Sequence, residues 1–230
     1  MSIEIVPTGA ALGAEIRGVN LAEPLDDTTF TAIERSYNQY GVIFFRDQRL
    51  APPQQVAFTR RFGEIEFNIF GERWSVPGSP EIVVVSNVTE DGQPIGVRRA
   101  GENWHSDMCY APRPPRGTML YALEIPDLFG LNLGDTEFAS AAAAWDALPE
   151  SLRQRLDGRR ATFDFTGRKR AFPPKQSEID RYRQSPIRSF GHTPIPDANA
   201  STSCATTAPV LRASTRRRPR RLSPRLPSIS

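Results

Sequence analysis

The sequence predicts one domain of mixed helices and strands, α+β or mainly β, followed by a tail of different composition. Short apolar runs typical of strands are interspersed with stretches of helical period. These segments do not alternate regularly as strand, helix and strand, which argues against a doubly wound parallel sheet. With 230 residues, of which 39% are hydrophobic and 24% charged, the chain can bury a core of ordinary size.

The first 41 residues predict a hairpin and a helix. Residues 3–21 combine short apolar runs with three glycines, as in a β-hairpin. Asp26 or Asp27 can cap the following helix at its start, and Gly41 ends it. Apolar residues of this helix recur at helical spacing, at Phe30, Ile33, Tyr37 and Tyr40.

A strand and a second helix come next. Residues 42–45 are four consecutive apolar residues and predict a buried strand. Pro52 and Pro53 suit the first turn of a helix, which we expect to stop at Gly63. Residues 82–85 predict another strand.

The remainder of the domain combines loops, strands and one interrupted helix. A loop rich in glycine and charged residues covers 90–102, and residues 118–123 predict a strand. Residues 139–156 predict a helix that is interrupted near Pro149. Residues 161–165 predict a further strand.

The composition changes abruptly after Tyr182. Residues 183–230 are dominated by Ser, Thr, Pro, Ala and Arg, and contain nine arginines, one acid and a single aromatic residue. They show no helical or strand period, so they cannot bury enough apolar area to offset the entropy lost on ordering. We therefore divide the chain into a partial globular domain at 1–182 and a disordered basic tail at 183–230.

The charge and the absence of leader or membrane signals limit the classes of function that the sequence allows. The net charge is +3, but the tail supplies the excess of arginine, so the preceding domain is net acidic and we do not expect it to bind nucleic acid. No run of about 18 apolar residues predicts a membrane span, and the N-terminus does not resemble a secretory signal. Two cysteines, Cys109 and Cys204, make no disulfide framework, which favours a cytoplasmic protein.

His105-Ser106-Asp107 is the motif most directly connected to chemistry. Side chains at i and i+2 of a strand or its end point the same way, so the imidazole and the carboxylate can converge on one metal ion. Two such ligands and a distant histidine form the 2-His-1-carboxylate triad of non-haem iron(II) enzymes. Alone, the motif is weak, because a histidine with a neighbouring acid also arises on ordinary surfaces.

The surroundings of this motif resemble the taurine dioxygenase / 2,4-dichlorophenoxyacetate dioxygenase family. The stretch NWHSDMCY is followed by APRPPRGTMLYALEIP and GDTEFAS, as in that family. GAEIRGVNLAEPL near the start, YGVIFFRDQ at 40–48 and ALPESLRQRLDGRRATFDF at 147–165 resemble it in the same order. The resemblance extends over about residues 3–182.

The resemblance implies a double-stranded β-helix, or jelly-roll, here incomplete at its C-terminal end, and an Fe(II)/2-oxoglutarate-dependent dioxygenase. His105 and Asp107 would bind iron, and Thr136 would contact 2-oxoglutarate. Asn103 and Trp104 would line the substrate side, although packing is the simpler role for Trp104. The reaction would use O2 to hydroxylate a small organic acid or sulfonate-type substrate, and the resemblance leaves a homo-oligomer open.

The chain departs from the family pattern after the first two ligands. The family has a distal histidine well over a hundred residues further on, and an arginine that binds the far carboxylate of 2-oxoglutarate. The only other histidine here, His192, is 87 positions after His105 and lies in the tail. Residues 127–133 also form a longer, more apolar connection to Thr136 than the family has. We therefore expect little or no activity from this chain.

Our hypothesis for the tail is a change of reading frame near residues 182–186. Permitted codons for residues 186–203, read two bases later, encode HPVIRTHPDTGRKCLYV, which resembles the segment that the family has next. An Arg/Pro/Ser-rich product is also typical of a GC-rich gene read out of frame. The alternative is a non-catalytic remnant or binding module whose basic tail, with RRRPRR at 216–221, contacts nucleic acid.

Overall fold

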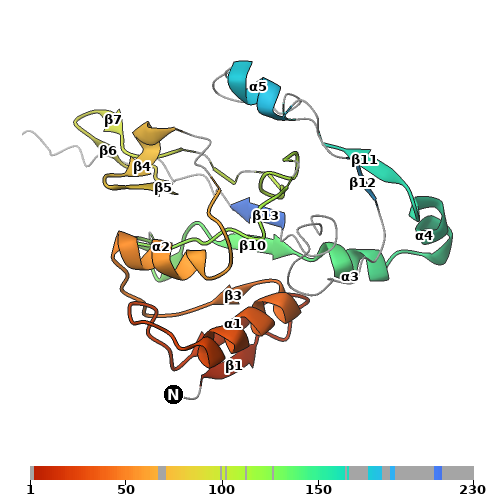
Figure 1. Ribbon diagram of the computed structural model, residues 1–230, viewed down its shortest axis with the longest axis horizontal. Coiled ribbons are helices and arrows are strands. Elements are labelled where there is room, and N and C mark those ends of the chain that lie inside the picture. Colours follow the sequence, from red (N-terminus) through yellow and green to blue (C-terminus); the bar gives the residue numbers. More distant parts are fainter. Residues whose placement is uncertain are drawn as a thin grey trace, which may run out of the picture.

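The computed structural model describes residues 3–66, 71–98, 100–101, 103–111, 113–125, 127–163, 165, 176–182, 187–189 and 210–213. These residues form a compact N-terminal lobe, a middle region of short hairpins, and C-terminal elements that begin beside the lobe at residues 136–146 and then extend away from it (Figure 1). The described part is thus a mixture of helices and strands, as the sequence predicts.

The N-terminal lobe begins with the predicted hairpin. Strands β1 (Glu4–Pro7) and β2 (Ala14–Arg17) pair in antiparallel register, with Ile5 opposite Ile16. Strand β3 (Ile43–Phe44) adds to β2 in parallel, and is shorter than the predicted strand. Parallel neighbours need a crossover, which helix α1 (Asp27–Tyr40) provides between β2 and β3.

The bounds of α1 follow from its two caps. Asp26 lies at the N-cap, and its carboxylate accepts a hydrogen bond from the backbone N–H of Thr29 at 2.8 Å. Gly41 adopts a left-handed conformation at φ 69°, and its N–H donates to the carbonyl of Tyr37. Both predicted ends of this helix are therefore confirmed.

Helix α2 (Pro52–Arg60) closes the core of the lobe. Its prolines occupy the first turn as predicted, and the helix ends just before the predicted stop at Gly63. Phe58 of α2 packs edge-on against Phe30 of α1, with ring centroids 6.4 Å apart. The buried centre of the lobe consists of Ile16, Leu21, Phe30, Ile33 and Phe58.

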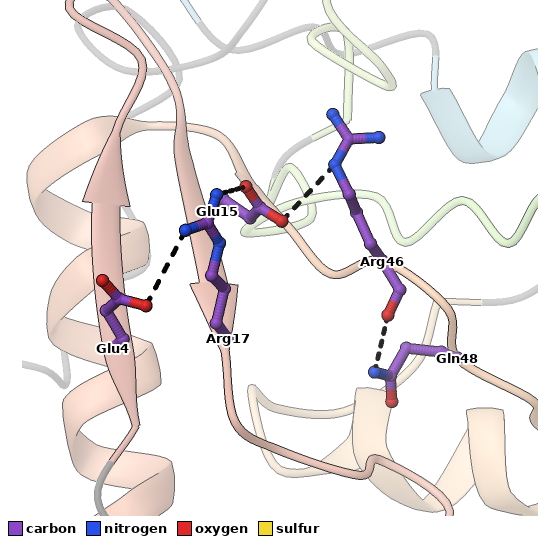
Figure 2. A network of polar contacts seen from close by, with 5 residues as sticks. All are labelled: Glu4, Glu15, Arg17, Arg46 and Gln48. Carbon is purple, nitrogen blue, oxygen red and sulfur yellow. Dashed lines mark hydrogen bonds and ion pairs between the residues drawn. The ribbon is translucent and has the colours of Figure 1, made fainter.

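A polar network fixes the loop after β3 against the hairpin. The carboxylate of Glu15 accepts from Arg17 at 2.8 Å and lies 3.4 Å from Arg46, while Arg17 also lies 3.8 Å from Glu4 (Figure 2). These two arginines hold the pKa of Glu15 below its usual range, Arg17 first by its hydrogen bond. Gln48 continues the network by donating to the carbonyl of Arg46.

The middle region contains small two-stranded sheets. Residues Ile82 and Val83 end a strand that begins earlier than predicted, and Val85 makes an isolated bridge to Val97. The predicted strand at 118–123 is wrong, because this segment forms no ladder with another described strand. The elements here are η1 (Glu72–Trp74), β4 (Ser75–Val76), β5 (Ser79–Val83), β6 (Thr89–Glu90), β7 (Gln93–Pro94), β8 (Asp127–Leu128) and β9 (Leu131–Asn132).

The C-terminal elements include the interrupted helix. It is split into α3 (Ala141–Asp146) and α4 (Glu150–Leu156) on either side of Pro149, which confirms the predicted break. Strand β11 is shorter than predicted, and α5 follows it. The elements outside this helix are β10 (Thr136–Ala139), β11 (Arg160–Thr162), α5 (Gln176–Tyr182), β12 (Ile187–Ser189) and β13 (Val210–Ala213).

Two short strands lie in the segment that we expected to lack regular structure. β12 pairs with β11, and β13 pairs with β10, both in antiparallel register. The expectation of a tail without strands is therefore wrong at these two places, where the edges of β10 and β11 offer backbone groups to pair with. Residues 183–186, just after the predicted domain boundary, and the rest of the tail, including His192, lie outside the described residues.

The described strands do not close into a barrel. They form one three-stranded sheet and five two-stranded sheets. Over the same residues, no helix has the length and apolar character needed to cross a membrane.

Candidate functional site

His105 and Asp107 converge as their spacing predicts. The Nε2 atom of His105 lies 3.2 Å from Oδ1 of Asp107, and both side chains are partly buried. The pair does not lie on a regular strand: Asp107 begins a turn that runs to Tyr110, with Met108 at φ 48° and its carbonyl bonded to the N–H of Ala111 at 2.8 Å. His105 takes part in a β-bridge, and the turn begins at Asp107.

The backbone before the pair fixes the histidine ring. The carbonyl of Asn103 lies 2.7 Å from Nδ1 of His105. A carbonyl only accepts hydrogen bonds, so Nδ1 carries the proton that is donated to it, and Nε2 is the ring nitrogen that faces Asp107. This is the arrangement in which an imidazole binds a metal through Nε2.

The carboxylate of Asp107 is held from its other side. The hydroxyl of Thr118 donates to Oδ2 at 2.6 Å, a length typical of a hydrogen bond to an ionised carboxylate. Oδ1 is the oxygen that remains on the side of His105. Sequence reasoning missed Thr118, since nothing in its spacing from Asp107 indicates a contact.

The Nε2 and Oδ1 atoms suit a shared cation. When the imidazole is neutral with its proton on Nδ1, both atoms are acceptors, and two acceptors at 3.2 Å are stabilised by a positive ion between them. Ligand bonds of about 2.1 Å at a right angle would separate two donor atoms by roughly 3.0 Å, close to the observed value. One imidazole and one carboxylate also form part of the donor set of non-haem iron(II) sites.

The segment that carries Thr118 is anchored on the N-terminal lobe. Arg116 donates to Glu34 and to Asn38, and the hydroxyl of Tyr37 donates to the Arg116 carbonyl at 2.7 Å. Burial raises the pKa of Tyr37, while nearby Arg116 opposes that rise.

Tyr121, three residues after Thr118, makes a second set of contacts between this segment and the N-terminal lobe. Its hydroxyl accepts from the N–H of Leu50 at 3.0 Å and donates to the carbonyl of Gln48 at 3.2 Å. Met119 packs against the buried core of the lobe. Thr118 therefore lies between two residues, Arg116 and Tyr121, that are each hydrogen-bonded to the N-terminal lobe.

An aromatic cluster packs on the turn that follows Asp107. The ring centroid of Tyr110 lies 4.8 Å from Phe165 and 5.2 Å from Tyr182 of α5. Phe165, Tyr182 and Ala111 are buried, and Met108 packs against them. This small second core holds the turn from the side opposite to the N-terminal lobe.

The other predicted site residues make fewer side-chain contacts with the His105–Asp107 pair. Asn103 contributes through its backbone carbonyl, and Trp104 is 47% exposed beside the pair. Thr136 is the first residue of β10, where it is exposed and pairs with Ala213. Within the described residues, no three His, Cys, Asp or Glu side chains form a group that could hold a metal ion.

Comparison with known proteins gives a family match. A profile of the family described as "Taurine catabolism dioxygenase TauD, TfdA family" matches residues 4–227. A taurine dioxygenase from Burkholderia xenovorans of known structure has a similar fold, with a TM-score of 0.55 and 32% identity, covering 72% of this chain and 55% of that chain.

Two curated relatives show similar identity. Over 165 residues the chain is 32% identical to an (S)-phenoxypropionate/alpha-ketoglutarate-dioxygenase of Sphingobium herbicidovorans, covering 68% of this chain and 51% of that protein. Over 171 residues it is 36% identical to an alpha-ketoglutarate-dependent 2,4-dichlorophenoxyacetate dioxygenase of Cupriavidus pinatubonensis, covering 70% and 58% respectively. The chain thus spans little more than half the length of these relatives.

Proposed function

The chain belongs to the taurine catabolism dioxygenase TauD, TfdA family, and from this membership we propose that its His105–Asp107 pair is an iron(II) site for 2-oxoglutarate-dependent oxidation. The observation that carries the proposal is the convergence of Nε2 and Oδ1 at 3.2 Å, with both side chains held by hydrogen bonds on their far sides. The substrate is a small organic acid or sulfonate, in keeping with relatives named for aryloxy acids.

The chain's own residues have distinct roles in this proposal. His105 and Asp107 bind the metal, and the Asn103 carbonyl keeps the imidazole in the tautomer that binds. Thr136 contacts a carboxylate of 2-oxoglutarate, and Asn103 and Trp104 face the substrate. When bound, iron(II) together with 2-oxoglutarate and O2 supplies the oxidising chemistry, while the protein provides ligands and orientation.

In this proposal the 230-residue chain catalyses the reaction slowly, because the family's distal histidine and arginine have no counterpart in it. His192 is its only other histidine and is not a suitable third ligand by spacing. We attribute this to a change of frame near residues 182–186, since the same bases read two positions later can encode a family-like segment. The jelly-roll then lacks the strands that complete it.

Metal binding tests the site directly. Mn(II) titrated into the full chain and followed by electron paramagnetic resonance should bind, and Asp107→Ala should weaken binding by at least about tenfold because it removes one of two ligands. Asp157→Ala is the matched control, since it removes an exposed aspartate at the end of α4. Equal Mn(II) affinity in the parent and Asp107→Ala would show that the pair is not the site.

Succinate release tests the activity. The full chain and a version with its frame changed by two bases near codon 186 are compared with Fe(II), 2-oxoglutarate and O2. We expect the frame-changed chain to release succinate at least about tenfold faster, since it regains a third ligand. Equal rates would refute the claim that this chain lacks residues needed for catalysis. A gene sequence that confirms the present reading frame, with no family-like segment in another frame, would refute the frame change.

A further inference from the structure

We propose that Thr118 is a positioning residue that selects which oxygen of Asp107 faces the metal. The inference rests on the proposed function, because it concerns the orientation of a ligand at the His105–Asp107 site. The hydroxyl of Thr118 donates to Oδ2 at 2.6 Å, and Oδ1 lies 3.2 Å from Nε2 of His105. One oxygen is therefore used for orientation and the other for binding.

The terminal torsion of the Asp107 carboxylate is soft, so a hydrogen bond to one oxygen can set its orientation. Rotation about the Cβ–Cγ bond of an aspartate is broad and nearly two-fold, so the two oxygens exchange easily without an external contact. Asp107 also sits in a turn rather than in a strand ladder. A hydroxyl donor on one side keeps the plane of the carboxylate pointed toward His105.

Thr118 is suited to this task by its own stiffness and by its anchors. A β-branched side chain has few χ1 rotamers, so the direction of the hydroxyl is set mainly by the backbone. That backbone is fixed through Arg116, which bonds Glu34 and Asn38 of α1. It is fixed again through Tyr121, which bonds the backbone of Leu50 before α2.

The position of Thr118 thus connects the N-terminal lobe to the ligand pair. Asp107 is 11 residues before Thr118 in the chain, and the Thr118 hydroxyl is a direct hydrogen bond between the lobe-anchored segment and the site. The hydrogen bond is exposed to solvent, so water competes with it and its effect on metal affinity belongs at the lower end of the ten- to hundredfold range for such partners.

Three variants of the full chain test this role by Mn(II) titration under electron paramagnetic resonance. Thr118→Val keeps the shape but removes the donor, and should weaken Mn(II) binding by about tenfold. Thr118→Ser keeps the donor, and should stay within about threefold of the parent. Thr89→Val makes the same chemical change at an exposed position of β6 and should leave the affinity unchanged.

The outcomes separate this role from the site itself. Failure of the parent to bind Mn(II) overturns the site, and the role of Thr118 with it. Binding by Thr118→Val as tight as by the parent overturns the positioning role and leaves the site standing. Equal losses in Thr118→Ser and Thr118→Val overturn it as well, because the hydroxyl would then make no difference. Thermal unfolding of each metal-free variant should stay close to that of the parent.

Discussion

The N-terminal lobe and residues 118–138 are built from similar apolar residues, yet the lobe buries its own and residues 118–138 leave most of theirs exposed. Ile33 in α1 is fully buried, whereas Leu123 is 87% and Phe129 95% exposed. The five buried residues at the centre of the lobe lie between Ile16 and Phe58. Met119 of the later segment packs against this core.

The His105–Asp107 pair lies where these two regions meet. Its orientation comes from the lobe through Thr118, and its turn is held by the cluster of Tyr110, Phe165 and Tyr182. The described elements are therefore enough to orient both side chains of the pair.

Truncation of the lobe's most buried residue should give the largest effect. Ile33→Ala removes a fully buried side chain and should lower the free energy of unfolding by about 2–5 kcal/mol. Leu123→Ala is the matched control and should change it by less than about 0.5 kcal/mol, because its side chain is already in solvent. Urea unfolding followed by circular dichroism measures both, and a similar loss in each would mean that residue 123 is covered in solution.

A side chain at Gly117 should disturb the connection between lobe and site. A Cβ there would meet the hydroxyl of Tyr37 and lie 3.1 Å from its Cζ. Gly117→Ala should therefore cost about 1–3 kcal/mol of stability, and it should weaken Mn(II) binding because Thr118 moves with its neighbour.

The double variant of Gly117→Ala with Tyr37→Phe distinguishes the clash from other causes. Removing the hydroxyl opens part of the space that the new methyl group needs, so the two changes should cost less together than the sum of their separate costs. Additive losses in urea unfolding would place the effect of the alanine elsewhere.

Local chemistry decides how much of this structure the sequence could predict. The bounds of α1 depend on Asp26 and Gly41, whose capping groups lie within the helix ends themselves. The convergence of His105 and Asp107 follows from a spacing of two. The segment at 118–123 has strand-like residues but no ladder, because a strand also requires a neighbour that its sequence does not reveal. Thr118 was missed for the same reason, since only the folded chain brings it to Asp107.

Removal of the Tyr37 hydroxyl should give the smallest effect and the most specific pH dependence. Tyr37→Phe loses the hydrogen bond to the Arg116 carbonyl and should cost about 1 kcal/mol near neutral pH. Burial raises the pKa of Tyr37 in the folded state, so the folded protein favours the protonated phenol. This contribution to stability is fully present below the unfolded pKa of about 10 and is lost as the pH rises through the folded pKa.

The phenylalanine variant should therefore lose less stability than the parent between neutral pH and pH values above about 10. Tyr40→Phe, three residues further along α1, is the control, because the described structure shows no hydrogen bond from its hydroxyl. Urea unfolding at a series of pH values compares the three proteins. Parallel alkaline losses in all three would mean that the Tyr37 phenol is hydrated in solution, and that the anchor between the lobe and the site is looser than its contacts with Arg116 indicate.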